Sequence, residues 1–430
     1  MNARSCPAWF IAAPASGQGK TTATAALARY HARQGKRVAV FKAGPDFLDP
    51  LITARASGSP TYQLDLWMCG EADVRARLYA AANAADLILV EGAMGLFDGH
   101  PSSADLAEQL GLPVVVVVDV SAMAQTLGAL LYGLAHFRKS VRVAGVIANR
   151  AAGDYHIHLL RETLPDGIRW LGALPSDVSI NLPARHLGLV AADELADLDR
   201  RLDALADTWD QYGDSMLPPR VAFESAELAP VPPVLRGRRI AIARDAAFCF
   251  LYPANIDLLR AAGAELRFFA PVAGEPLPEC DAVWLPGGYP ELHLAALSKR
   301  GDLAVALRAH CNARKPLLAE CGGLLFALDT LSDSDGRTGA MAGLLPGTAT
   351  VQAQLAALGL QEVALPEGRL RGHTFHHARA EVRAPILAHT HNPNGGPSIE
   401  AVFRVDRLTA TFMHLYFPSN PEAAVRLFLP

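Results

Sequence analysis

Residues 14–21 read Pro-Ala-Ser-Gly-Gln-Gly-Lys-Thr, a glycine-rich loop that ends in Lys20 and Thr21. Such a loop binds phosphate through its backbone N–H groups and through the positive end of the helix that follows it. The lysine reaches the outer phosphates and the hydroxyl reaches Mg²⁺. The loop therefore predicts binding of ATP with Mg²⁺ in a parallel α/β domain.

The flanking sequence is what this motif requires. Apolar residues 9–13 predict a strand before the loop, and Ala-rich residues 22–34 predict a helix after it. Gly17 and Gly19 permit the tight turn, although Pro14 stands where the full signature has its first glycine.

Further apolar runs alternate with Ala-rich stretches as far as residue 190, which predicts a parallel sheet covered by helices on both faces. The predicted strands are residues 37–42, 87–90, 113–119 and 143–148.

Residues 215–237 are Pro-rich and lose this periodicity, so they predict a semi-rigid linker. A second α/β series follows, with strands expected at residues 239–244, 265–269, 282–285 and 317–319. A chain of 430 residues is long enough for two domains, here 1–214 and 238–430.

Carboxylates follow two of the strands in the first domain. Glu91 comes at the end of one strand, and Asp46 and Asp49 follow another, where α/β sheets place their ligands. Hard carboxylate oxygens suit Mg²⁺, so Thr21, Glu91 and Asp46 are the expected metal ligands, with Asp49 at the metal or the acceptor. The alternatives are a helix cap for Asp46 and a solvated acid for Glu91.

Cys321 lies on a predicted sharp turn between a buried strand and a helix, a position that favours a thiolate nucleophile. Gly322 allows the close turn, and the earlier loop with Gly287 and Gly288 can offer amides to an oxyanion. The alternative is a cysteine that is simply buried in the core.

The base for this cysteine has to come from elsewhere in the chain, and His414, in an apolar strand-like run, is the predicted one. The alternative is a hydrogen-bonded core histidine. His373, His376 and His377 form a second cluster, which is spaced too irregularly to predict a zinc site. We interpret them as substrate or interdomain contacts.

Composition excludes several classes of partner. The net charge is −4, with no general basic field for nucleic acid, and the apolar runs are too short to cross a bilayer. The 6 cysteines lack CxxC spacing and no export signal is visible, so we expect reduced thiols in the cytoplasm. The sequence does not indicate the oligomeric state.

The motifs together resemble those of the glutamine-dependent a,c-diamide synthases of corrinoid biosynthesis, over nearly the whole chain. The resemblance rests on residues 13–22, 44–50, 90–99, 182–189, 285–291 and 320–323, in that order. It implies a dethiobiotin-synthetase-like domain followed by a class I, Triad-type glutamine amidotransferase domain.

The resemblance also implies roles for single residues. Cys321 would be the glutaminase nucleophile, with its reactivity raised by His414, and Asn149 would lie on the adenine side of ATP. Two positions depart from related patterns. Tyr416 stands where Triad enzymes have a glutamate two residues after the histidine, and Thr374 stands where relatives tend to have glutamate.

The implied reaction is ATP-dependent amidation of the a and c carboxylates of cobyrinic or hydrogenobyrinic acid. It would proceed through acyl phosphates and ammonia from L-glutamine. Alternatives are cobyric acid synthase, or an amidotransferase acting on nickel sirohydrochlorin or a cell-wall lipid intermediate. A P-loop regulatory switch is a non-enzyme alternative, which Ala15 disfavours because partitioning ATPases carry a second lysine there.

Overall fold

The computed structural model describes residues 3–177, 182, 197–228, 230–397 and 399–430. The chain forms two compact units, Met1–Leu228 and Ala229–Pro430, and the division between them falls inside the expected linker. Part of that linker is ordered differently from the expectation, since residues 220–224 form strand β8 (Arg220–Glu224), antiparallel to β1 (Ala3–Ala12). Every second residue of β8 is buried, as in a strand with one face on the core. The segment therefore belongs to the first unit, although prolines flank it in the sequence.

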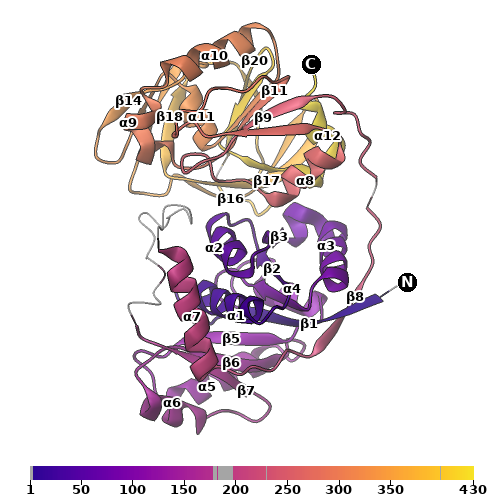
Figure 1. Ribbon diagram of the computed structural model, residues 1–430, viewed down its shortest axis with the longest axis vertical. Coiled ribbons are helices and arrows are strands. Elements are labelled where there is room, and N and C mark those ends of the chain that lie inside the picture. Colours follow the sequence, from indigo (N-terminus) through magenta and orange to yellow (C-terminus); the bar gives the residue numbers. More distant parts are fainter. Residues whose placement is uncertain (1–2, 178–181, 183–196, 229, 398) are drawn as a thin grey trace. The chain divides into compact units, whose positions relative to one another are not determined.

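The first unit is built around one sheet with strand order β3-β2-β4-β1-β5-β6-β7, in which all of these pairs are parallel (Figure 1). Besides β1, its strands are β2 (Val38–Ala43), β3 (Tyr62–Leu64), β4 (Leu87–Glu91), β5 (Val114–Asp119), β6 (Val143–Ala151) and β7 (Arg169–Pro175). Its helices are α1 (Lys20–Arg33), α2 (Leu48–Ser57), α3 (Glu71–Ala84), α4 (Ser103–Gln109), α5 (Thr126–Phe137), α6 (Asp154–Arg161) and α7 (Leu198–Tyr212), with a π-type turn η1 (Leu66–Gly70). The five predicted strands and the helix after the loop are confirmed, whereas β3 and β7 were not predicted.

The strand composition explains why this sheet has buried faces. Val114 to Val118 of β5 are all buried, as expected for a central parallel strand whose two faces are both covered. Alanines of α1 face the core, which lets the helix that begins at the phosphate-binding loop pack closely on the sheet. This packing fixes the carboxyl ends of β1, β2 and β4 around the start of α1.

The second unit has a sheet with strand order β10-β9-β11-β12-β21-β20-β19, parallel as far as β21 and antiparallel beyond it. Its strands are β9 (Arg239–Ala243), β10 (Glu265–Phe269), β11 (Ala282–Leu285), β12 (Leu317–Glu320), β19 (Ile386–His389), β20 (Ala401–Val405) and β21 (Leu408–Thr411). Its helical segments are α8 (Pro253–Ala261), η4 (Pro290–His293), α9 (Leu294–Leu297), α10 (Gly301–Asn312), α11 (Gly322–Ala327), η5 (Phe417–Ser419) and α12 (Pro421–Arg426). The four strands predicted here are confirmed.

Two smaller sheets complete this unit, and of their strands the sequence analysis indicated only the strand-like run that contains His414. One has the order β14-β13-β15-β18 and the other the order β16-β17-β22. Their strands are β13 (Thr330–Ser332), β14 (Thr338–Ala340), β15 (Gly347–Val351), β16 (Ala357–Leu365), β17 (Gly368–His376), β18 (Ala378–Val382) and β22 (His414–Tyr416). The three-stranded sheet carries His414, the predicted base.

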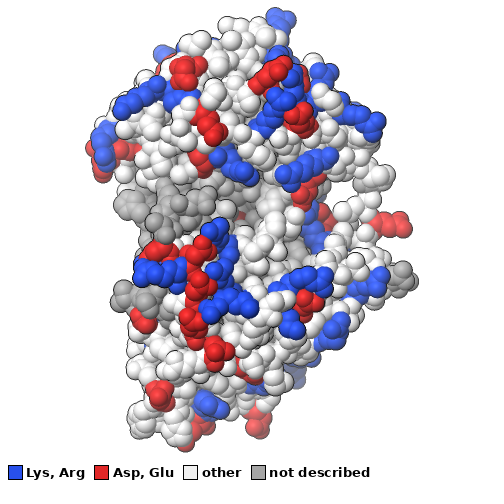
Figure 2. Space-filling view, viewed as in Figure 1, with Lys and Arg blue, Asp and Glu red and all other residues white. Residues whose placement is uncertain are grey.

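On the face shown in Figure 2, acidic and basic side chains are interspersed, in keeping with the small net charge. Among the described residues, no helix has the length and the apolar character needed to cross a bilayer.

Candidate functional site

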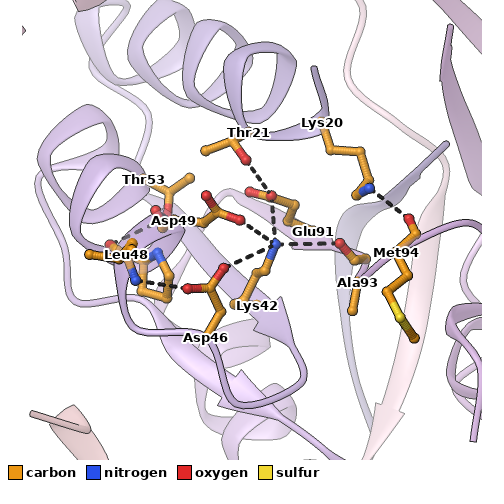
Figure 3. Close-up of polar contacts among 12 residues, drawn as sticks. Lys20, Thr21, Lys42, Asp46, Leu48, Asp49, Thr53, Glu91, Ala93 and Met94 are labelled. Carbon is orange, nitrogen blue, oxygen red and sulfur yellow. Dashed lines mark hydrogen bonds and ion pairs between the residues drawn. The ribbon is translucent and has the colours of Figure 1, made fainter. Parts of the chain in front are cut away.

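The phosphate-binding loop passes from β1 into α1 with Gly17 and Gly19 at positive φ, 79° and 94°. A side chain at Gly19 would also collide with Asn149, whose Nδ2 would lie 2.1 Å from an added Cβ. Lys20 opens the helix and donates from Nζ to the backbone oxygen of Met94 at 2.6 Å (Figure 3). Burial, with the positive charge of Lys42, lowers the pKa of Lys20. The negative charge of a bound phosphate oxygen would oppose both influences and raise the pKa of Lys20 again.

Three carboxylates and one lysine meet at the ends of β2 and β4. The Nζ of Lys42 lies 2.7 Å from Oε1 of Glu91, 2.8 Å from Oδ2 of Asp49 and 4.0 Å from Oδ2 of Asp46 (Figure 3). Thr21 donates its hydroxyl to the same Oε1 of Glu91 at 2.8 Å. Of these residues, Thr21, Lys42, Asp46 and Asp49 line a cavity of about 540 Å³ together with the phosphate-binding loop.

Lys42 is a site residue that the sequence analysis missed. Lys42 lies opposite Glu91 in the register of the parallel strands β2 and β4. A lysine at the end of one predicted strand and a glutamate at the end of the next could therefore have indicated this pair. Burial alone would lower the pKa of Lys42, but the charges of Asp49, Glu91 and Asp46 outweigh burial and raise it. Lys42 is therefore a fixed cation beside the cavity.

Replacing Lys42 with alanine should lower the free energy of unfolding of the first unit by about 3–5 kcal/mol, because it leaves buried carboxylates without their cation. Urea unfolding followed by tryptophan fluorescence measures this, since Trp9, Trp67, Trp170 and Trp209 lie in this unit and Trp284 in the other. The matched control is alanine at the exposed Lys36.

Adding Asp49→Asn to the Lys42→Ala variant should recover part of the loss, because it removes one of the uncompensated charges. A Lys42→Ala protein as stable as the Lys36→Ala control would contradict the assignment of Lys42 as the neutralising cation.

Asp46 accepts a hydrogen bond from the backbone N–H of Leu48 at the start of α2, so the capping alternative describes one of its contacts. Its other oxygen faces Lys42, and the side chain lines the cavity. Its role at the metal or the acceptor stays a prediction. The solvated alternative for Glu91 is wrong, since its side chain is 1% exposed.

Asn149 lies in β6 behind the phosphate-binding loop. Its side chain is buried and donates from Nδ2 to the backbone oxygen of Gln18 at 2.9 Å, while Oε1 of Gln18 accepts from the N–H of Asp119. These two bonds hold the loop to the ends of β5 and β6. Asn149 lies outside the set of residues that line the cavity, so its direct contact with adenine stays a prediction.

The donor atoms beside the loop fit a Mg²⁺ ion that is shared with phosphates. The Oε2 of Glu91 is buried and has no hydrogen-bond partner among the described residues. Those residues also contain no group of three or more His, Cys, Asp or Glu side chains placed to hold a metal by themselves. Mg²⁺ commonly binds through one or two carboxylates together with phosphate oxygens and water. Glu91 could provide the carboxylate, and Thr21 could add its hydroxyl.

The second cluster forms where β12 turns into α11. Cys321 has φ 46°, a strained value for a residue with a side chain, and its N–H donates to the backbone oxygen of Thr411 at 2.8 Å. An added Cβ at Gly322 would lie 2.8 Å from the nitrogen of Gly288, so the two glycine loops touch. This is the geometry of a nucleophile on an elbow beside potential oxyanion donors.

The imidazole of His414 borders the same loop. An added Cβ at Gly287 would lie 2.3 Å from Cε1 of His414, and the ring packs edge-on against Phe250 at 5.8 Å between centroids. Burial, followed by the charges of His373 and His376, lowers the pKa of His414. A neutral imidazole is the form that can accept a proton.

The sequence expectation that the helix start favours a Cys321 thiolate needs correction. Burial raises the pKa of the Cys321 thiol, and the Glu291 carboxylate raises it further. The helix that follows has only 6 residues, so its dipole is a weak opposing influence. A neighbouring base that removes the thiol proton would therefore favour reaction of Cys321 as a nucleophile.

Glu320 connects the two halves of this cluster, a role that the sequence analysis did not assign. Its Oε1 accepts from the N–H of Leu415, directly after His414, and its Oε2 accepts from Nε1 of Trp284, both at 2.8 Å. Burial raises the pKa of Glu320 to about 8 despite these donors. Glu320, directly before Cys321, is thus hydrogen-bonded to the residue directly after His414.

The second histidine cluster lies beside His414. His373 is its partner across β17 and β22, and Nε2 of His376 lies 3.0 Å from Oε1 of Glu400. Thr374 donates to the same oxygen, so Glu400 supplies a carboxylate next to the position where relatives tend to have glutamate. Apart from Leu182, the motif at 182–189 lies outside the described residues.

Two family models match the chain, one in each unit. The CobQ/CobB/MinD/ParA nucleotide binding domain matches residues 9–190, and the CobB/CobQ-like glutamine amidotransferase domain matches residues 239–422.

Curated relatives match over the full length. A hydrogenobyrinate a,c-diamide synthase of Stutzerimonas stutzeri is 60% identical over 100% of both chains, and one of Pseudomonas aeruginosa is 59% identical over 100% of this chain and 99% of its own. A cobyrinate a,c-diamide synthase of Herminiimonas arsenicoxydans is 48% identical over 98% of this chain and 96% of its own.

Proposed function

The chain belongs to the glutamine-dependent a,c-diamide synthase family, and from this premise we propose that it amidates the a and c side-chain carboxylates of a corrinoid acid. ATP activates each carboxylate and L-glutamine supplies the ammonia, in cobalamin biosynthesis. The observation that carries the proposal is 60% identity to such an enzyme over the full length of both chains. Each half-reaction needs a site of its own, and we assign one candidate site to each unit.

Hydrogenobyrinic acid is the acceptor we favour over cobyrinic acid. The two relatives near 60% identity bear the hydrogenobyrinate name, whereas the relative at 48% bears the cobyrinate name. None of the six cysteines forms a disulfide, which suits a reducing compartment, and we therefore propose a cytoplasmic location.

In the first half-reaction a side-chain carboxylate attacks the γ-phosphorus of ATP, giving an acyl phosphate and ADP. Lys20 exchanges the Met94 carbonyl for a phosphate oxygen, and Lys42 offsets charge at the carboxylate cluster. A Mg²⁺ ion held by Thr21 and Glu91, with Asp46 and Asp49 nearby, would neutralise phosphate charge. Positioning and charge neutralisation are the main demands of such a step.

In the second half-reaction His414 takes the Cys321 proton as Sγ attacks the carboxamide carbon of glutamine. The oxyanion that forms would accept hydrogen bonds from backbone N–H groups in the loops of Gly287, Gly288 and Gly322. His414 returns the proton to the leaving ammonia, and water then releases glutamate from the thioester. Ammonia displaces phosphate from the acyl phosphate, and a carboxamide remains.

Mass analysis of the products tests the proposal. With ATP, Mg²⁺ and glutamine, hydrogenobyrinic acid should yield a product with two carboxamides, and cobyrinic acid should react with lower kcat/KM. Equal or higher kcat/KM with cobyrinic acid would reverse the acceptor preference. A protein that hydrolyses ATP but forms no amide with either acid would support the regulatory-switch alternative instead.

A further inference from the structure

A buried carboxylate next to the cysteine has no role in the reaction described above. Glu291 lies in η4, directly after the Gly287–Gly288 loop and Pro290. The residue is half-buried as a whole, but its Oε2 atom is buried and has no hydrogen-bond partner among the residues that the structure describes. A buried acceptor without a donor is costly unless a ligand supplies the donor.

The backbone of the cysteine elbow packs against the start of η4. An added Cβ at Gly322 would lie 3.0 Å from Cδ of Pro290, the residue before Glu291. The Glu291 charge also reaches the thiol, because after burial it is the largest influence raising the pKa of Cys321. Glu291 is therefore close enough to the nucleophile to contact a small substrate bound there.

The surroundings of Glu291 favour a cation. Burial, with the negative charge of Asp333, raises the pKa of Glu291 to about 7, and no basic group is among the causes of this shift. Asp333 has its own partners, the N–H groups of Asp335 and Arg337 and the guanidinium of Arg337 at 3.0 Å. A positive ligand group at Glu291 would supply the missing charge.

L-glutamine carries such a group at a suitable distance from its reacting carbon. Its α-ammonium nitrogen is four bonds from the carboxamide carbon, roughly 5 Å when the side chain is extended. We propose that Glu291 binds the α-ammonium group of L-glutamine and so selects an amino acid as the nitrogen donor. The proposal rests on the glutaminase role of Cys321 proposed above.

This contact also links binding to activation of the thiol. A free Glu291 carboxylate opposes formation of the thiolate, because two negative charges would lie close together in a buried site. The α-ammonium group of bound glutamine cancels that charge, so Cys321 ionises more readily when the correct substrate is present. The empty enzyme keeps a less reactive thiol.

The test compares L-glutamine with glutaramate, the analogue that lacks the α-amino group, in wild type and Glu291→Gln. In the variant, KM for glutamine should rise about 10- to 100-fold, the range of a charge-assisted hydrogen bond. The preference for glutamine over glutaramate, measured as the ratio of kcat/KM values, should fall by a similar factor. Synthesis driven by ammonium chloride should be unchanged, and Glu279→Gln, at an exposed glutamate of the same unit, is the control.

Alkylation of Cys321 by iodoacetamide, followed by peptide mass spectrometry, gives a second readout. The Glu291→Gln variant should show a lower apparent thiol pKa, although it binds glutamine more weakly. If it misfolds, Glu291→Asp tests the same ratio, which should fall by an intermediate factor. A folded variant that keeps the wild-type preference for glutamine overturns the proposal, whereas absence of glutamine turnover in the wild type overturns the glutaminase role itself.

Discussion

Replacing Cys321 with alanine should reduce glutamine-dependent amidation by at least about 10³-fold, the scale seen when a covalent nucleophile is removed. Amidation driven by ammonium chloride should persist, because in our proposal residues of the other unit activate the carboxylate. Glutamate release and carboxamide formation, assayed with each nitrogen source, measure the two effects separately.

The structural reason is the position of Cys321 on the elbow itself. Cys321 is held at φ 46° between two contacting glycine loops, with His414 against one of them. Cys311 is a matched control, since it lies in the same unit but is half-buried on α10, and burial raises its pKa to about 11. Alanine at Cys311 should leave both activities unchanged.

Failure of ammonium to support synthesis in a folded Cys321→Ala protein would contradict the separation into two sites. Retention of glutamine-dependent synthesis would remove Cys321 from the reaction altogether. Circular dichroism and thermal unfolding establish that the variant is folded before either conclusion is drawn.

The parts of the fold that could be predicted are those with strong local patterns. The valine run of β5 and the apolar run of β4 identify buried parallel strands because both faces of such strands are covered. Strands β13 to β18 are short or half-exposed, so their alternation is weak and their pairing depends on distant segments. Strand β8 was missed for a related reason, since neighbouring prolines suggested an extended linker.

The site residues also fall into two groups, those that a local motif reveals and those that depend on tertiary contacts. Lys20 and Cys321 lie in glycine-rich local motifs, and such motifs can be recognised without tertiary information. Lys42 and Glu320 act through partners 49 and 95 positions away, Glu91 and Leu415, so only strand pairing reveals them. The raised pKa of Cys321 also depends on burial and on Glu291, neither of which is visible in the local sequence.

Replacing Lys20 with methionine should lower synthesis by about 10²- to 10³-fold with glutamine and with ammonium alike, the scale expected when one preorganised charge is removed from a transition state. Methionine keeps the length and the apolar stem of the side chain but removes the ammonium group. The variant therefore tests the charge that Lys20 directs at the Met94 carbonyl in this structure and, in our proposal, at a phosphate of ATP.

The rates of synthesis with glutamine and with ammonium distinguish this variant from Cys321→Ala, because Lys20→Met should lose both and Cys321→Ala only the first. A lost phosphoryl transfer removes the acyl phosphate, so neither source of ammonia has an activated carboxylate to attack. Alkylation of Cys321 by iodoacetamide should be unchanged, because the two residues lie in different compact units. Methionine at the exposed Lys36 is the control. Wild-type rates in Lys20→Met would remove the phosphate role from Lys20, and loss of the glutamine-driven reaction alone would place Lys20 in nitrogen delivery rather than in activation.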